Sequence, residues 1–228
     1  MQKMRLLRAK IVHSKNLVRS ALIRKIFQRY FPLLLILWIV FVLYPNPSKL
    51  VISVQRVFSP DIDTVAVEPM LCDLPSDPEA TEKAVLERIP YCYDWEVYDV
   101  PWYFPTAAEV LQNEKGDCKA RAIVLAAVFE AENIPYRLNI SPIHIWVEYK
   151  GKVETQLENS EVNFYQLDPV TGKKLFQIPD INLKEIMDYT WQGFWEPMPV
   201  SRKALLFSGL FILVTIRLIL VSRAKRKN

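Results

Sequence analysis

The sequence predicts an α+β domain that lies between two membrane-spanning helices. Two apolar runs stand near the ends of the 228-residue chain, at 31–44 and 204–222. Between them, a helical run rich in Ala, Val, Leu and Ile covers 120–132, and segments of alternating polar and apolar residues follow it. These are the patterns of a buried helix and of strands. All 25 acidic residues also fall between the two apolar runs.

Charge is distributed unevenly along the chain. The net charge is +4, but residues 1–45 carry nine Lys/Arg, residues 204–228 carry five, and neither end has an acidic residue. Basic tails are typical of proteins that bind nucleic acid or membranes. Because these tails flank apolar runs and lack the interleaved aromatics of a base-reading fold, we expect a lipid bilayer as partner and no nucleic acid.

The N-terminal region predicts a membrane helix preceded by a basic cytoplasmic tail. Residues 1–29 form the tail, in which 4–29 has the spacing of a basic amphipathic helix; a disordered tail is the alternative. The predicted span covers 30–45 and is short against the roughly 20 residues that a crossing needs. A cleaved signal peptide is disfavoured, because the basic region is long and no small-residue cleavage site follows.

The C-terminal region predicts a second span over 204–222 and a basic tail over 223–228. Arg217 interrupts the span, but it is close enough to the tail for its side chain to reach the interface. The juxtamembrane segment 181–203 includes an aromatic cluster typical of a membrane interface. By the positive-inside tendency, we expect a two-pass protein of the cell membrane with both termini cytoplasmic and the domain outside.

The region between the spans begins with a proline-rich connector over 46–78, in which 50–57 has the composition of a strand. A helix is expected over 77–89, with Pro78 at its first position. The segment 91–104 is rich in aromatic residues, which suit core packing or the wall of a binding groove equally well.

Cys118 stands directly before the central helical run and directly after the turn signal Gly116-Asp117. Backbone N–H groups at a helix N-terminus are unpaired and partly positive, and they stabilise a thiolate. Taken alone, a buried unreactive cysteine is the commoner interpretation.

Two later residues favour a reactive cysteine. Successive strands are expected over 136–140, 143–149, 152–157 and 162–167, followed by a helix over 181–189. His144 shares one face of its strand with Trp146 and Glu148, and Asp168 ends the last strand. A thiol, an imidazole and a carboxylate are the parts of a nucleophilic triad.

Five blocks together resemble the transglutaminase-like superfamily, in that family's order and spacing. They are 105–111, Gly116-Asp117-Cys118, 134–137, 144–148 and 167–169. The resemblance covers about 80–170 and implies a papain-like core domain over 79–180, in which a cysteine-bearing helix packs on an antiparallel sheet. It implies Cys118, His144 and Asp168 as catalytic residues, and by analogy Trp102 as an oxyanion donor.

The implied activity is that of a membrane-anchored thiol protease, amidase or transglutaminase-type acyltransferase. Cys118 would attack an amide bond of an extracytoplasmic peptide or protein and form a thioester, which water or an amine then resolves. No cofactor is expected. The alternative is a catalytically inactive binding or scaffold domain in a membrane complex, which has no need of a reactive thiol.

Three cysteines suit an outward location, where disulfides form. Cys72 and Cys92 are the expected pair, which leaves Cys118 free as nucleophile. No metal site is expected, because the only histidine besides His144 is His13 in the basic tail and no Cys-x-x-Cys motif occurs.

Overall fold

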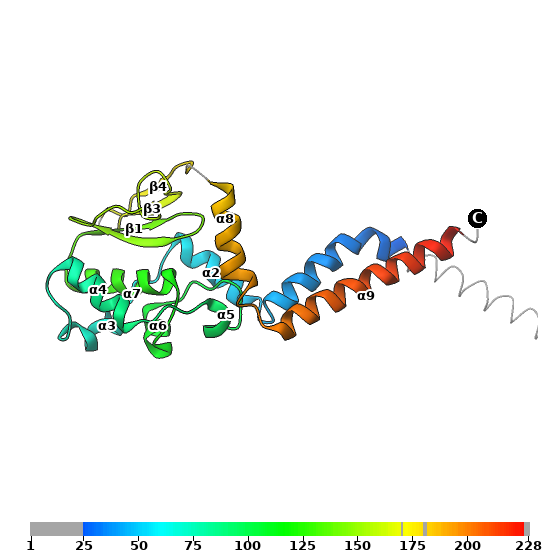
Figure 1. The fold of residues 1–228 in the computed structure, drawn as a ribbon, viewed down its shortest axis with the longest axis horizontal. Helices are drawn as coiled ribbons and strands as arrows, with labels where there is room; N and C mark the ends of the chain where they lie inside the picture. Colours follow the sequence, from blue (N-terminus) through cyan, green and yellow to red (C-terminus); the bar gives the residue numbers. More distant parts are fainter. Residues whose placement is uncertain (1–24, 170, 180–181, 226–228) are drawn as a thin grey trace, which may run out of the picture. The chain divides into compact units, whose positions relative to one another are not determined.

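The computed structural model describes residues 25–169, 171–179 and 182–225. The described part is α+β, with helices and a four-stranded antiparallel sheet (Figure 1). The chain divides into two compact units, one made of the two chain ends and the other of Asn46–Pro199. Residues 4–24, most of the basic amphipathic helix predicted over 4–29, lie outside the described residues.

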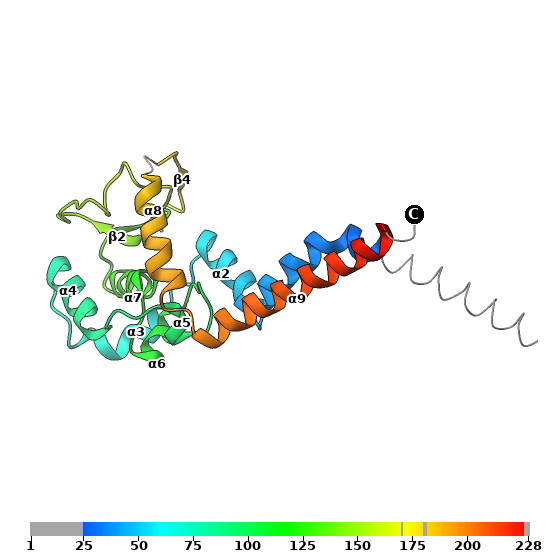
Figure 2. The same ribbon diagram turned by 45° about the vertical axis from the view of Figure 1, so that its right-hand side comes forward.

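The terminal unit consists of two long helices, Lys25–Leu43 and α9 (Val200–Lys225). They lie side by side in both ribbon views (Figures 1 and 2), and Trp38 Nε1 donates to Leu206 O at 3.3 Å. A Cβ at Gly209 would lie 2.0 Å from the Trp38 ring, so this close approach requires glycine. The Arg217 guanidinium lies over the Phe31 ring, 4.4 Å from its centre.

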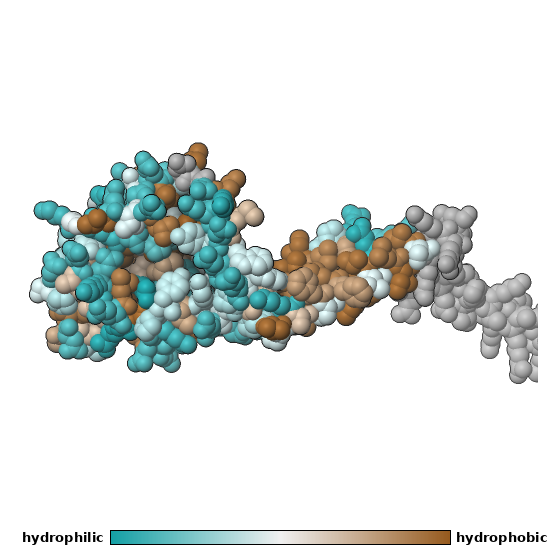
Figure 3. All heavy atoms as spheres, in the orientation of Figure 1, coloured by the Kyte–Doolittle hydropathy of each residue, from teal (hydrophilic) through white to brown (hydrophobic). Residues whose placement is uncertain are grey.

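Both terminal helices are long and apolar enough to cross a membrane. Apolar residues colour much of their surface in the space-filling view, whereas the surface of Asn46–Pro199 mixes polar and apolar residues (Figure 3). The helices overlap the predicted spans 30–45 and 204–222. The prediction of two helices suited to a bilayer is therefore confirmed at the level of length and composition.

In the unit Asn46–Pro199, helices come both before and after the strands along the chain. Their bounds are α2 (Ser48–Phe58), α3 (Thr64–Leu71), α4 (Pro78–Arg88), α5 (Asp94–Val97), α6 (Ala107–Asn113), α7 (Cys118–Ala131), α8 (Leu183–Thr190) and the π-helix η1 (Trp191–Trp195). The helices predicted over 77–89, 120–132 and 181–189 are confirmed as α4, α7 and α8.

The strand-like piece predicted over 50–57 is wrong, because this stretch belongs to α2. Its β-branched residues suggested a strand. However, Leu50, Val54, Val57 and Phe58 follow the i, i+4, i+7, i+8 spacing of one helical face. Buried Ser53 fixes the helix to the domain, because its hydroxyl accepts from Phe104 N at 3.0 Å.

The sheet has the order β2-β1-β3-β4, and neighbouring strands are antiparallel. Helix α7 packs against β1 and β2, and also against α3, α4 and α6, so the cysteine-bearing helix is almost wholly buried. The bounds are β1 (Tyr136–Ile140), β2 (Ile145–Tyr149), β3 (Tyr165–Leu167) and β4 (Lys174–Phe176).

The predicted strand over 152–157 is also wrong, since this stretch is irregular. The turn after β2 does form, with Gly151 at φ +95°, a conformation that favours glycine. Beyond it the backbone leaves the sheet, and the Lys152 ammonium pairs with Glu82 and Glu158. The next strand of the sheet is β3, which pairs with β1. The fourth strand, β4, was not predicted, and it pairs with β3 at the edge of the sheet.

Candidate active site

Cys118 is the first residue of α7, as the sequence predicted. The Asp117 side chain caps the helix and accepts from Lys119 N at 3.0 Å and from Ala120 N at 3.4 Å. Gly116 is required here, because a Cβ would lie 2.3 Å from that of Ala120. The loop is further held by Gly116 N, which donates to Pro90 O at 3.1 Å. This framework presents a partly exposed thiol at a helix N-terminus.

His144 lies one residue before β2, at the end of a tight turn. The Ser141 hydroxyl accepts from His144 N at 2.9 Å and from Ile143 N at 3.3 Å, and Ser141 N donates to His144 O at 2.8 Å. The imidazole stacks on Trp146, with ring centres 6.0 Å apart and planes 10° from parallel. The backbone turn and the stacked ring together fix where the imidazole points.

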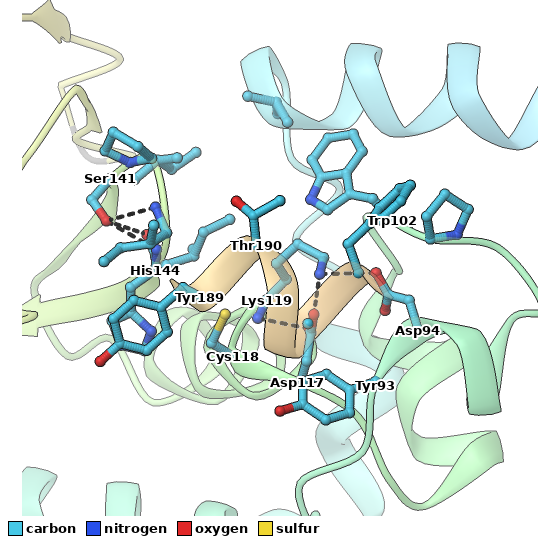
Figure 4. Close-up of a pocket in the computed structure, with 18 of the residues that line it drawn as sticks. Tyr93, Asp94, Trp102, Asp117, Cys118, Lys119, Ser141, His144, Tyr189 and Thr190 are labelled. Carbon is cyan, nitrogen blue, oxygen red and sulfur yellow. Dashed lines mark hydrogen bonds and ion pairs between the residues drawn. The ribbon is translucent and has the colours of Figure 1, made fainter. Parts of the chain in front are cut away.

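Cys118 and His144 line one cleft of about 640 Å³ (Figure 4). All of its walls belong to the unit Asn46–Pro199. They come from the C-terminal half of α2, from 91–102, from 117–119, from 140–145, from Phe164 and from 189–194. The structure thus brings together two of the three predicted catalytic residues.

The carboxylate that contacts His144 is that of Glu158. His144 Nε2 and Glu158 Oε1 are 2.6 Å apart, and about a fifth of each side chain is exposed. Burial alone would lower the pKa of His144, but hydrogen bonds with the Cys118 thiol and Glu158 outweigh it and raise that pKa to about 9. Around neutral pH the imidazole is therefore protonated, between a sulfur and a carboxylate.

Asp168 lies elsewhere on the sheet. Ile140 pairs with both Ile145 and Tyr165, whereas Leu138 pairs with Leu167. His144 and Asp168 therefore stand at opposite ends of β1 and on opposite sides of it, roughly 13 Å apart along the strands alone. The Asp168 carboxylate accepts from Thr171 N at 3.1 Å and lies 4.0 Å from Arg137 Nε. The structure does not bring Asp168 to His144.

Glu158 belongs to a network that the sequence did not indicate. Its second oxygen lies 3.0 Å from Lys152 Nζ, which lies 2.6 Å from Glu82 Oε1 on α4. The other Glu82 oxygen accepts from Tyr149 OH at 2.6 Å. Burial alone would raise the pKa of Glu158, but hydrogen bonds to His144 and Lys152 outweigh it and lower that pKa. Glu158 is thus a charged, fixed acceptor for His144.

A buried charge cluster lies on the other side of Cys118 (Figure 4). Lys119 Nζ is 2.9 Å from Asp94 Oδ2 and also contacts the Asp117 carboxylate. Asp94 Oδ2 accepts from Tyr103 N at 2.7 Å, which ties the chain next to Trp102 to the start of α7. The only sequence signal for this cluster was a lysine directly after Asp117, at the start of a mostly apolar helix.

Two carboxylates share one ammonium in this cluster. Burial alone would lower the pKa of Lys119, but Asp117 and Asp94 outweigh it and raise that pKa. Burial raises the pKa of Asp94 to about 7; Asp117 adds to this rise and Lys119 opposes it. Both pKa values are raised because two carboxylates surround one ammonium. The ammonium holds its proton tightly, and the second carboxylate has no cation of its own.

The aromatic segment 91–104 serves both of its predicted purposes. Tyr91, Tyr93 and Trp102 line the cleft. Others are buried in the domain, namely Trp95, Tyr98, Tyr103 and Phe104. Trp102, the predicted oxyanion donor, therefore lies in the same cleft as Cys118.

All three cysteines lie in the described part of the chain, and each is a free thiol. The expected disulfide between Cys72 and Cys92 is not formed. Cys72 directly follows α3, as its C-cap residue, and is exposed. Cys92 is held beside the cleft, because its backbone N–H donates to Gly116 O at 3.0 Å and its thiol to Glu96 Oε2 at 3.4 Å. Within the described residues, no cluster of acidic, His or Cys side chains is arranged to hold a metal ion.

Comparisons of the chain with family models, with curated proteins and with solved structures find no match.

Proposed function

We propose that this chain is a membrane-anchored cysteine enzyme that transfers acyl groups through a thioester, acting on amide bonds in the manner of the transglutaminase-like proteins it resembles. The observation that carries the proposal is one cleft in which a thiol at a helix N-terminus contacts an imidazole that is itself held by a carboxylate. A buried structural cysteine needs neither partner.

In the proposed mechanism, the Cys118 thiolate attacks the carbonyl carbon of the substrate. A C–S bond forms, and the C–N bond breaks as the leaving amine takes a proton from the His144 imidazolium. Water or a second amine then attacks the thioester and gives its proton to His144, while the C–S bond breaks and restores the thiolate. Glu158 holds the imidazole in place throughout and stabilises its charged form.

The developing oxyanion needs donors fixed near Cys118. We assign this part to the Cys118 backbone N–H, at the start of α7, and to the Trp102 indole. The position of Trp102 in the cleft wall supports the second assignment. The hydrogen bond from Tyr103 N to Asp94 supports it further, because it steadies the backbone next to Trp102.

The proposal predicts that His144 controls the reactivity of Cys118. Alkylation of Cys118 by iodoacetamide at about pH 6 should be fast in the wild type and at least tenfold slower in His144→Ala, because the variant lacks the cation that pairs with the thiolate. The pKa of His144 is about 9, so the two rates should converge as the pH rises above 9 and the imidazole loses its charge.

The measurement is the alkylation rate of Cys118 against pH, followed by mass spectrometry, with Cys92 of the same chain as an internal reference. Cys92 lies beside the cleft, but its thiol donates to a carboxylate. A slow Cys118 that does not respond to His144→Ala would favour the inactive scaffold over an enzyme.

We further propose that both termini are cytoplasmic and that the domain faces outward. The basic flanks of both membrane helices support this orientation. Protease added to intact cells or spheroplasts should then remove the domain and leave the terminal tails intact. Loss of the tails with protection of the domain would require the opposite orientation.

A further inference from the structure

The cleft beside Cys118 is lined mainly by apolar side chains. Val54 and Phe58 of α2 are 47% and 45% exposed, although both line the cleft, so their apolar surface is open to a ligand. Pro142 and Ile143 of the turn before β2 and Phe164 before β3 add further apolar surface. The cleft has a volume of about 640 Å³. Pockets that bind small-molecule ligands have volumes of about 300–1,000 Å³, so this cleft can hold a ligand much larger than one amino-acid side chain.

The charged groups of the cleft already have partners, and that of His144 is Glu158. Asp94, Asp117 and Lys119 form the buried cluster, and the Ser141 hydroxyl is occupied by the backbone of its own turn. A peptide backbone in this cleft would bring a row of N–H and C=O groups, for which the lining offers a few uncharged polar side chains, those of Tyr91, Tyr93, Trp102, Tyr189, Thr190 and Gln192, and otherwise apolar surface. Each group left unpaired there would weaken binding. An aliphatic chain has no such requirement and gains from every apolar contact.

We infer that the acyl group transferred by Cys118 is a long aliphatic chain, which lies in this cleft with its carbonyl carbon at the thiol. The inference rests on the proposed thioester chemistry and names its substrate class. The chain also carries two helices long and apolar enough to cross a bilayer, where aliphatic acyl chains are the abundant apolar molecules. The acyl donor is therefore a lipid, whose acyl chain is joined through an amide or ester bond at its carbonyl carbon.

The test uses the full chain in lipid nanodiscs and 4-nitrophenyl esters of acetic, butyric, hexanoic and octanoic acids. The thiolate attacks the ester carbonyl, a C–S bond forms, and 4-nitrophenolate leaves with the electrons of the broken C–O bond. The burst of nitrophenolate gives the acylation rate constant, and mass spectrometry locates the acyl group. The rate constant should rise about fourfold for each methylene that the cleft buries.

A matched pair of variants removes the influence of the lipid. Val54 and Val51 stand one turn apart on α2 and are 47% and 58% exposed, but only Val54 lines the cleft. Val54→Asn should slow octanoyl transfer about fivefold and leave acetyl transfer within about twofold. Val51→Asn should leave both unchanged, although it changes the same helix in the same way.

Each other outcome contradicts a defined part of the inference. If Cys118 is acylated but the rate does not rise with chain length, the aliphatic substrate is wrong and the thiol chemistry stands. The same holds if the 4-nitrophenyl ester of an apolar dipeptide of octanoyl size reacts faster. If none of the esters acylates Cys118, both the substrate class and the proposed function are wrong.

Discussion

Replacing Glu158 with glutamine is expected to lower turnover roughly 10²- to 10⁴-fold while leaving the fold intact. The carboxylate lies 2.6 Å from His144 Nε2. In the proposed mechanism it holds and charges the imidazole that exchanges protons with the leaving group and with the water that resolves the thioester. An amide is neutral and can donate instead of accept, so the imidazole would lose both its charge partner and its fixed tautomer. Losses of this size follow when the orienting carboxylate of a triad becomes an amide.

Asp168→Asn is the matched control for this change. The two carboxylates are equally accessible, with 20% of the Glu158 side chain and 22% of the Asp168 side chain exposed. Because Asp168 lies at the far end of β1 from His144, its amide variant should retain turnover within about threefold of the wild type. Steady-state release of nitrophenolate from 4-nitrophenyl acetate measures both variants, and circular dichroism checks that both are folded.

The reverse result would assign the orienting role to Asp168, the residue implied by the resemblance. A large loss in Asp168→Asn with normal turnover in Glu158→Gln would also require β3 to pair with the sheet in a different order. The pair of variants therefore tests the strand order β2-β1-β3-β4 together with the catalytic role.

The start of α7 could be predicted from sequence because every determinant is local. Gly116, Asp117 and Cys118 are neighbours, and capping depends on residues two or three positions apart. The turn of His144 is almost as local, since Ser141 fixes it from three residues away. Such features appear in the sequence as short patterns, and they supplied two of the three residues of the site.

The third residue depended on strand order, which is not local. The alternation around Asp168 predicted a strand and its end, but not that β3 would pair with β1 and place Asp168 at the far end of β1 from His144. Glu158 lies in an irregular loop that is held by Lys152 and Glu82, and Glu82 is 76 residues earlier in the chain. No periodicity marks such a contact. For α2, composition favoured a strand, but the spacing of its apolar residues already indicated a helix.

Lys119→Met is expected to destabilise the domain by about 3–5 kcal/mol, the usual effect of removing one partner from a buried ion pair. Only 5% of the lysine side chain is exposed, and Asp94 at 2.9 Å is equally buried. Without the ammonium, two carboxylates would face each other away from water. Replacement of the exposed Lys83 on α4 by methionine removes the same charge and should change the free energy of unfolding by less than about 0.5 kcal/mol.

The loss in Lys119→Met should grow with pH. The pKa of Asp94 is already raised to about 7 beside Lys119, and it must rise further once the ammonium is gone. Wild-type Asp94 releases its proton near pH 7, whereas the folded variant keeps it to higher pH, so the two proteins lose stability alike up to about pH 7 and the deficit of the variant grows as the pH rises above that value. Urea unfolding of the full chain, followed by pulse proteolysis at pH 5 and pH 8, measures the effect.

Adding Asp94→Asn to Lys119→Met should restore much of the stability at pH 8, because one carboxylate then remains. A deficit that is equal at both pH values and unaffected by Asp94→Asn would mean that Lys119 acts through packing of its aliphatic chain and not through its charge.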